Sequence, residues 1–232
     1  MTGVQTCALP ISVIGTAVYT STFTPSTTPL QPIANTSLLT CQSPRFVDNS
    51  ANNYSITPRG TASVQRFSPY SGTTLPTPYY GAYFDGSGDY LTVPASSSFA
   101  FGTGDFTIEF WMNTSDTTAG LITPATQGAG YWALMIYSSS LYWQSAYNVT
   151  NLKNVSLSGY LNNTWVHVAI VKYSGNINFY FNGTVQGSAT ADGSNYNGSA
   201  TLTIGYDSLG NGYYTGYISN LRIVKEIGRA HV

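Results

Sequence analysis

The stretch FTIEFWMN, residues 106–113, decides the fold of this chain. Successive side chains of an extended strand point to opposite faces. One face of this stretch therefore holds Phe106, Ile108 and Phe110, and the other includes Glu109 and Trp111. β-branched and aromatic residues in this alternation are typical of a strand. The stretch predicts a strand with one face on an apolar core.

Similar runs, bounded by Gly, Asn and Asp, continue on both sides of this stretch. They cover residues 82–85, 89–93, 131–137, 140–144, 165–172, 177–182, 201–206 and 215–224. The Asn-Gly pair in FNGT, residues 181–184, is a strong hairpin signal. No ten-residue stretch has a helical period. Many short strands at this spacing predict an all-β fold, an antiparallel two-sheet sandwich or jelly roll.

The composition excludes several classes of partner. Charged residues make up 7% of the 232 residues, and the net charge is −1, whereas an average globular protein is about one quarter charged. Without a basic patch the chain lacks the electrostatic footprint of nucleic-acid binding. No apolar run approaches the roughly 20 residues of a membrane helix, so we expect no membrane insertion. The 14% aromatic content argues against disorder.

The two ends of the chain differ from the rest. Residues 5–12, QTCALPIS, and residues 226–232, EIGRAHV, can be encoded by opposite strands of one DNA segment that resembles a sequencing adapter. We therefore expect residues 1–12 and 226–232 to be adapter-derived. Scars of this kind are set aside before fold reasoning. Cys41 is then a lone cysteine, which excludes an internal disulfide.

Three blocks resemble laminin-G-like, concanavalin A-like jelly rolls. They are YFDGSGDYLTVPASSSFAFGTGDFTIEFWMN (83–113), WVHVAIVKYSGNINFYFNGTVQGS (165–188) and GYISNLRIVK (216–225). The resemblance implies one jelly-roll domain over residues 37–225, with its first strands in 37–42 and 46–60. Residues 13–36 carry several prolines among Ser and Thr. They are interpreted as a linker, the tail of a preceding repeat in a tandem array.

Concanavalin A-like jelly rolls also include β-glucanases, which need two carboxylates flanking the scissile bond. The nearest pattern here is Asp105 and Glu109, but Asp105 falls in a turn and no second glutamate lies nearby. Glu109 is interpreted as a strand carboxylate that pairs locally or faces solvent. His167 lies on a strand with two apolar faces and is interpreted as a packing residue with one hydrogen bond. We expect no enzyme.

Calcium is the metal that the resemblance suggests, bound at the rim of the sandwich by oxygen ligands. The candidate ligands are Asp192 and Asp207, which lie in turn-rich loops. Asp and Asn beside Gly are also ordinary turn residues. Many relatives carry an acidic pair where this chain has Ser219 and Asn220, which weakens the calcium interpretation. No cofactor is certain; Ca²⁺ is the one candidate.

Aromatic side chains provide the candidate ligand-binding site. Trp143 and Tyr214 have polar neighbours in sequence and are predicted to stack on sugar rings, with Asn211 binding hydroxyls. Trp111 and Trp165 are predicted to lie in the core. Such sites are mostly apolar with a few placed polar groups.

These features predict a non-catalytic carbohydrate-binding or adhesion module of a multi-repeat extracellular or virion-surface (tail-fibre-like) protein. Its expected partners are a neutral glycan or surface glycoprotein and the neighbouring repeats, with no nucleic acid. The alternatives are a purely structural spacer repeat and a glycoside hydrolase of the β-glucanase type.

Overall fold

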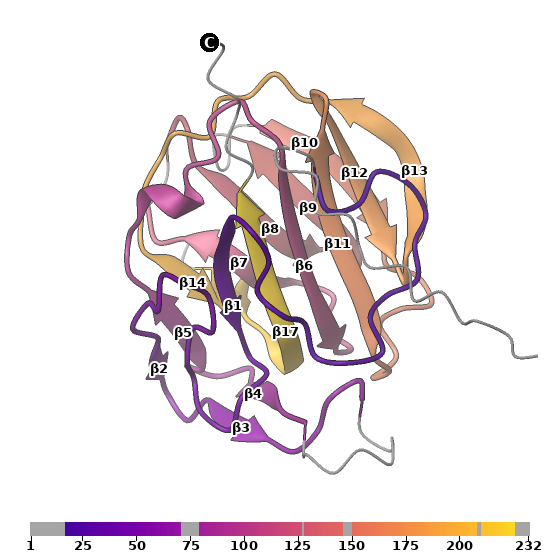
Figure 1. The fold of residues 1–232 in the computed structure, drawn as a ribbon. Coiled ribbons are helices and arrows are strands. Elements are labelled where there is room, and N and C mark those ends of the chain that lie inside the picture. The colour runs from indigo at the N-terminus through magenta and orange to yellow at the C-terminus, as the bar shows by residue number, and fades with distance from the viewer. Residues whose placement is uncertain (1–16, 71–78, 127, 146–149, 208–209, 226–232) are drawn as a thin grey trace, which may run out of the picture.

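The chain forms two antiparallel β-sheets packed face to face (Figure 1). The computed structural model describes residues 17–70, 79–126, 128–145, 150–207 and 210–225. The two ends that are expected to be adapter-derived lie outside the described residues. Every pairing between neighbouring strands in the two sheets is antiparallel. The predicted all-β, two-sheet jelly-roll class is confirmed.

The larger sheet has eight strands in the order β13-β12-β11-β6-β17-β4-β3, and β1 also pairs with β17. Its strands are β1 (Thr36–Thr40), β3 (Ser63–Gln65), β4 (Gly81–Asp85), β6 (Phe106–Asn113), β11 (Val166–Tyr173), β12 (Asn176–Phe181), β13 (Thr184–Ala191) and β17 (Thr215–Lys225). Strand β6, which is the stretch FTIEFWMN, lies at its centre and pairs with β11 on one side and β17 on the other.

The smaller sheet has seven strands in the order β10-β9-β8-β7-β14-β5-β2. Its strands are β2 (Thr57–Arg59), β5 (Tyr90–Val93), β7 (Ala119–Pro124), β8 (Trp132–Tyr137), β9 (Ser140–Ser145), β10 (Thr150–Ser156) and β14 (Leu202–Ile204). A short hairpin of β15 (Tyr206–Asp207) and β16 (Gly212–Tyr213) packs beside β7. The helical element in the described residues is one 3-10 turn, η1 (Ser97–Phe99), and no described helix has the length and apolarity to cross a membrane.

The core lies between the sheets and follows from the alternation of the strands. The predicted apolar face of β6 is fully enclosed there, as are the matching residues of β11 and β12. Glu109 and Trp111 point to the opposite, outer face of the larger sheet. The predicted Asn-Gly turn joins β12 to β13, with φ of 49° at Asn182 and 78° at Gly183, the left-handed backbone that this turn type requires.

A bulge divides β17 into two halves with different partners. Its first half pairs with β4 and its second half with β1, and the register against β6 shifts between Ser219 and Arg222. Asn220 lies in this bulge with φ of 54° and is fully buried. Its backbone N–H donates to Cys41 O and its Oδ1 accepts from Leu30 N. The bulge therefore connects the closing strand to the N-terminal region.

Residues 17–35, here called the strap, cross the outer face of the larger sheet (Figure 1). Val18 N donates to Thr107 Oγ1, and Phe23 N donates to the carbonyl oxygen of Gly183. The rings of Tyr19 and Phe23 stack on each other and pack against the apolar residues Ala169, Val171 and Tyr180. The described part of residues 13–36 is held on the sheet by half-buried aromatic side chains, and its assignment as a linker stays a prediction. Its origin in a preceding repeat stays a prediction.

Candidate functional site

Trp143 is not a surface residue, so its predicted role in stacking on sugars is wrong. Its ring is 0% exposed, lies parallel to Trp132 in the core, and donates from Nε1 to the Tyr196 hydroxyl at 2.8 Å. In a strand, the residues before and after a given side chain face the opposite way. The polar neighbours of Trp143 therefore marked an inward position.

Tyr214 is also buried, which contradicts its predicted role. It is 0% exposed, and its ring meets Phe84 in a T-shaped contact. Its hydroxyl donates to Tyr217 O at 3.1 Å. Trp132, which stacks on Trp143, lies in the core as well.

The predicted calcium ligands do not come together as a metal site. Asp192 is buried, with Oδ2 at 3.3 Å from Lys172 Nζ and at 3.0 Å from the Tyr196 hydroxyl. An ammonium group occupies the place of a cation there, so the assignment of Asp192 as a ligand is wrong. Asp207 is buried and accepts from Asn211 Nδ2 at 2.6 Å. Among the described residues, no three His, Cys, Asp or Glu side chains gather where an ion would fit. Calcium near Asp207 stays a prediction.

The outer face of the larger sheet instead carries a group of aromatic side chains beside the strap. We call Phe67, Tyr83, Trp165 and Tyr217 the aromatic patch. Tyr83 and Tyr217 are direct cross-strand partners on β4 and β17, with ring centroids 4.9 Å apart. Phe67 lies 4.7 Å from the Tyr217 ring and 5.2 Å from the Trp165 ring. Trp111 and Trp165, predicted to be core residues, are half-buried on this outer face.

The aromatic patch is open to solvent and bordered by uncharged polar groups. Phe67 is 38% exposed, and the other three rings are half-buried. The Tyr217 hydroxyl donates to Gln65 Oε1 at 3.1 Å, and Ser63 pairs with Tyr83 across the sheet. Burial, followed by the nearby Tyr83, raises the pKa of Tyr217, so this hydroxyl stays neutral. The surface offers flat apolar rings together with neutral hydrogen-bonding groups.

A pocket adjoins the aromatic patch where the strap begins to cover the sheet. It has a volume of about 330 Å³ and is lined by Pro25, Ser26, Thr27, Pro69, Tyr70, Trp111 and Asn182. Trp111 is two positions along β6 from Asn113, about 6.7 Å of strand, and Asn113 pairs with Tyr217 of the patch. The loop that carries Phe67 also supplies Pro69 and Tyr70. The pocket therefore lies next to the patch on the outer face of the larger sheet.

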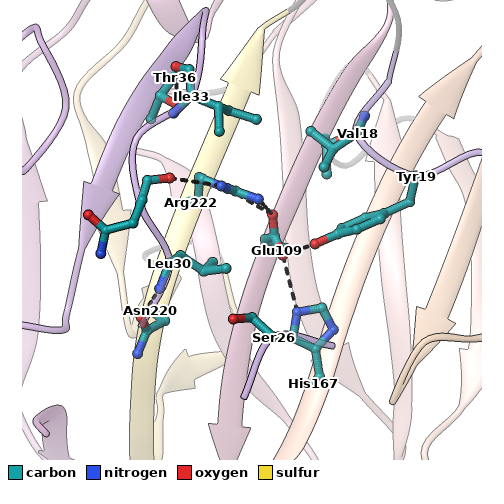
Figure 2. Close-up of polar contacts among 12 residues, drawn as sticks. Val18, Tyr19, Ser26, Leu30, Ile33, Thr36, Glu109, His167, Asn220 and Arg222 are labelled. Atoms are coloured by element: carbon teal, nitrogen blue, oxygen red, sulfur yellow. Dashed lines mark hydrogen bonds and ion pairs between the residues drawn. The ribbon is translucent and has the colours of Figure 1, made fainter. Parts of the chain in front are cut away.

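Beneath the strap, Glu109 is the centre of a buried polar network (Figure 2). Its Oε1 accepts from Arg222 Nε at 2.9 Å and from Nη2 at 2.5 Å. Its Oε2 accepts from the Tyr19 hydroxyl at 2.8 Å and lies 3.2 Å from His167 Nε2. Arg222 also donates to the strap carbonyl of Gln31. The network joins β6, β11 and β17 to the strap, and it confirms His167 as a buried packing residue with one side-chain hydrogen bond.

The surroundings of Glu109 fix its charge. Burial alone would raise the pKa of this carboxyl, but the His167 hydrogen bond and the Arg222 guanidinium outweigh it and lower the pKa. Burial, followed by the negative charge of Glu109, raises the pKa of the Tyr19 hydroxyl, which keeps it a hydrogen-bond donor. Glu109 is thus an ionised carboxylate with both oxygens engaged and no exposed surface.

A second tyrosine group lies on the other sheet. Tyr90, Tyr206 and Tyr213 are half-buried near the β15–β16 hairpin. The rings of Tyr206 and Tyr213 stack face to face, with centroids 4.4 Å apart and planes at 17°. Because these two rings cover each other, they leave less free ring surface than the tilted rings of the aromatic patch.

Comparison with known proteins agrees with the fold. A family model described as the concanavalin A-like lectin/glucanases superfamily matches residues 85–227. Among curated protein sequences, none matches the chain.

Solved structures with the same fold include the binding domains of botulinum neurotoxins. The binding domain of serotype D/C is 19% identical with a TM-score of 0.61, and the match covers 83% of this chain and 49% of that one. The binding domain of the neurotoxin DC in complex with SialylT is 19% identical with a TM-score of 0.60, covering 84% and 49%. The same domain in complex with rat synaptotagmin II is 16% identical with a TM-score of 0.59, covering 83% and 49%. The chain spans about half the length of these binding domains, and identity at this level establishes the fold.

Proposed function

Because the chain belongs to the concanavalin A-like lectin/glucanases superfamily, we propose that it is a non-catalytic carbohydrate-binding module whose ligand lies on the aromatic patch. The observation that carries this proposal is the exposure of Phe67 among three half-buried rings on the outer face of the larger sheet. The neurotoxin domains, one of them in complex with SialylT, supply precedent for binding by proteins that contain this fold.

The chemistry of the aromatic patch fits a neutral glycan. Aromatic faces attract the apolar C–H faces of sugar rings, and Gln65 and Ser63 are placed at the border to hydrogen-bond hydroxyls. The four rings, Gln65 and Ser63 carry no charge. The exposed Arg66, between Gln65 and Phe67 in the sequence, stacks on none of these four rings. An anionic sugar would need a cation such as Arg for strong recognition. A neutral glycan, free or on a surface glycoprotein, is therefore the partner that we infer.

The arrangement of Glu109 supports a module without catalysis. Glycosidic cleavage needs an acid and a second carboxylate on either side of the bond. Glu109 is buried beneath the strap and its oxygens are bonded to Arg222, Tyr19 and His167. A carboxylate held ionised in this way can neither donate a proton nor reach a sugar.

We infer that the module acts in a multi-repeat protein outside the cell or on a virion surface. An open aromatic surface makes few contacts with a glycan, so a single module binds weakly. Linked modules raise the effective concentration of the second site and hence the avidity. Neighbouring repeats are therefore proposed partners in function. A purely structural spacer would have no use for uncovered aromatic rings.

Removing the exposed ring should weaken glycan binding. We expect Phe67→Ala to lower the affinity for neutral glycans about tenfold, or ~1.4 kcal/mol, because a stacking surface is lost. The measurement is binding to an array of immobilised neutral glycans. Tyr137→Ala is the matched control, since Tyr137 is 51% exposed outside the patch. Tyr213→Ala tests the second tyrosine group. If Tyr213→Ala lowers the glycan affinity more than Phe67→Ala does, the ligand lies on the other sheet.

Binding should be insensitive to salt and to chelator. Raising NaCl from about 0.1 M to about 1 M shortens the Debye length from about 10 Å to about 3 Å, which weakens charge–charge attraction only. We expect less than a twofold change in affinity, and the same result with EDTA. A clear loss of binding in EDTA that added Ca²⁺ restores would revive the calcium prediction at Asp207.

A further inference from the structure

We propose that the pocket beside Trp111 holds the terminal ring of a neutral glycan, so that the module recognises the end of a chain. This proposal rests on the proposed function and specifies it. The pocket contains no charged side chain, and its volume of about 330 Å³ is at the small end of ligand sites, about 300–1,000 Å³. One sugar ring fits such a space, whereas a continuing chain does not.

The walls of the pocket have the chemistry of a sugar subsite. Trp111 presents a half-buried indole, held by T-shaped contacts with Tyr70 and His167. Asn182 is exposed, and its Oδ1 accepts from His167 N at 2.9 Å. That bond orients the Asn182 side chain and leaves its Nδ2 as a donor. The remaining walls are prolines, hydroxyl groups and the strap backbone.

The strap closes the pocket on the side away from the aromatic patch. Ser26 Oγ donates to Thr28 O at 2.6 Å and accepts from Thr28 N at 3.2 Å, which holds this part of the strap in a turn. Pro25 lies directly over the Asn182–Gly183 turn. A glycan on the patch can extend to Trp111 but no further across the sheet, because the strap covers the next residues. The geometry thus favours a chain end.

The proposal can be tested with free methyl glycosides of glucose, galactose, mannose and N-acetylglucosamine. Each would be titrated into the full chain by tryptophan fluorescence and by ligand-observed NMR. It would also be tested as a competitor of the glycans bound on the array. We expect at least one glycoside to bind and to compete at millimolar concentration. Ser26→Phe, which fills the pocket, should lower the affinity for that glycoside at least tenfold.

Control variants separate the pocket from the patch. Thr24→Phe places the same ring on an exposed strap residue that does not line the pocket, and it should leave the glycoside affinity within twofold. Asn182→Gly removes one pocket donor, adds no bulk and tolerates the left-handed backbone at this position, and it should lower the affinity for the glycoside severalfold. Phe67→Ala should weaken array binding, but it should lower the affinity for the free glycoside less than Ser26→Phe does.

The outcomes distinguish this proposal from the proposed function. If glycans bind the array and Phe67→Ala lowers their affinity, but neither Ser26→Phe nor Asn182→Gly lowers the affinity for the glycoside, the pocket proposal is overturned and the proposed function stands. If no glycan binds the array and no glycoside perturbs the NMR signals, both are overturned. Loss of glycoside binding in Ser26→Phe, with Thr24→Phe unchanged, supports the pocket.

Discussion

Glu109→Gln is expected to lower the free energy of unfolding by about 3–5 kcal/mol, the usual effect of removing one partner of a buried ion pair. The substitution keeps the shape of the side chain but leaves the Arg222 guanidinium buried without its counter-charge. For a domain of this size, roughly 2–4 °C of melting temperature accompanies each kcal/mol, so a fall of at least about 6 °C is expected. Chemical denaturation and thermal melts would measure it.

Two variants test the cause of that loss. Asp85→Asn changes an exposed carboxylate and should cost less than about 0.5 kcal/mol, as surface changes usually do. The double variant Glu109→Leu, Arg222→Met replaces the pair with apolar groups and should be more stable than Glu109→Gln, because no charge is left unpaired. A loss below 1 kcal/mol in Glu109→Gln would contradict the central role given to this network.

The same network should make the domain sensitive to acid. The folded pKa of Glu109 is lowered relative to an ordinary glutamate near 4.3, so the folded state binds this proton less readily than the unfolded state. The stabilisation from Glu109 is fully present above pH about 4.3 and is lost as the pH falls through the folded pKa. Denaturation series at neutral and acidic pH should show that the free energy of unfolding depends less on pH in Glu109→Gln than in the parent chain.

Gly183→Ala is expected to release the strap from the sheet. An added Cβ would overlap the carbonyl oxygen of Phe23 and press on Pro25 Cδ, while Phe23 N donates to Gly183 O. We expect a loss of about 2–4 kcal/mol in unfolding free energy, similar to other disruptions of close packing. Faster proteolysis within residues 17–35 and faster amide exchange at Phe23 would report the release.

Gly175→Ala is the matched control for this substitution. Gly175 also has positive φ, at 74°, and an added Cβ there would meet nothing within 4 Å. Both variants carry the backbone strain of an L-residue in the left-handed region, roughly 1–2 kcal/mol. The difference between them therefore measures the strap contact alone. Equal stability of the two variants, with equal protection of the strap, would show that Gly183 does not hold it.

The strands that the sequence predicted are those whose own alternation matches a half-buried or central position. Residues 106–113 became β6 with the expected faces. Strands β3, β7, β10, β13 and β16 were missed, and tertiary reasons explain β7 and β13. In β7, AGLITP, the glycine at 120 leaves space for Asp207 of the β15–β16 hairpin, a need that local sequence does not express. In β13, TVQGSATA, the side chains are mostly exposed, so pairing with β12 rather than hydrophobicity defines the strand.

The candidate site was less accessible to sequence reasoning. The prediction of an exposed Trp143 rests on its polar flanks, whereas in a strand polar flanks indicate an inward side chain. The aromatic patch draws its four rings from four separate segments, so only the order of strands brings them together. The strap looked like a linker because of its prolines. Tyr19 and Phe23 indicate that this segment packs on the sheet, because a solvated linker has no use for two large aromatic side chains.

The pairing of β1 with the end of β17 in the larger sheet determines how this domain would bear mechanical load. Thr36 pairs with Val224, so the start of β1 lies beside the end of β17. A pull on both flanking segments would first peel off the strap, contact by contact, and extend the chain by up to about 3.5 Å for each freed residue. It would then unzip β1 from β17 one pair at a time, instead of shearing many hydrogen bonds together. The strap would thus detach and extend under load while the two sheets stay folded.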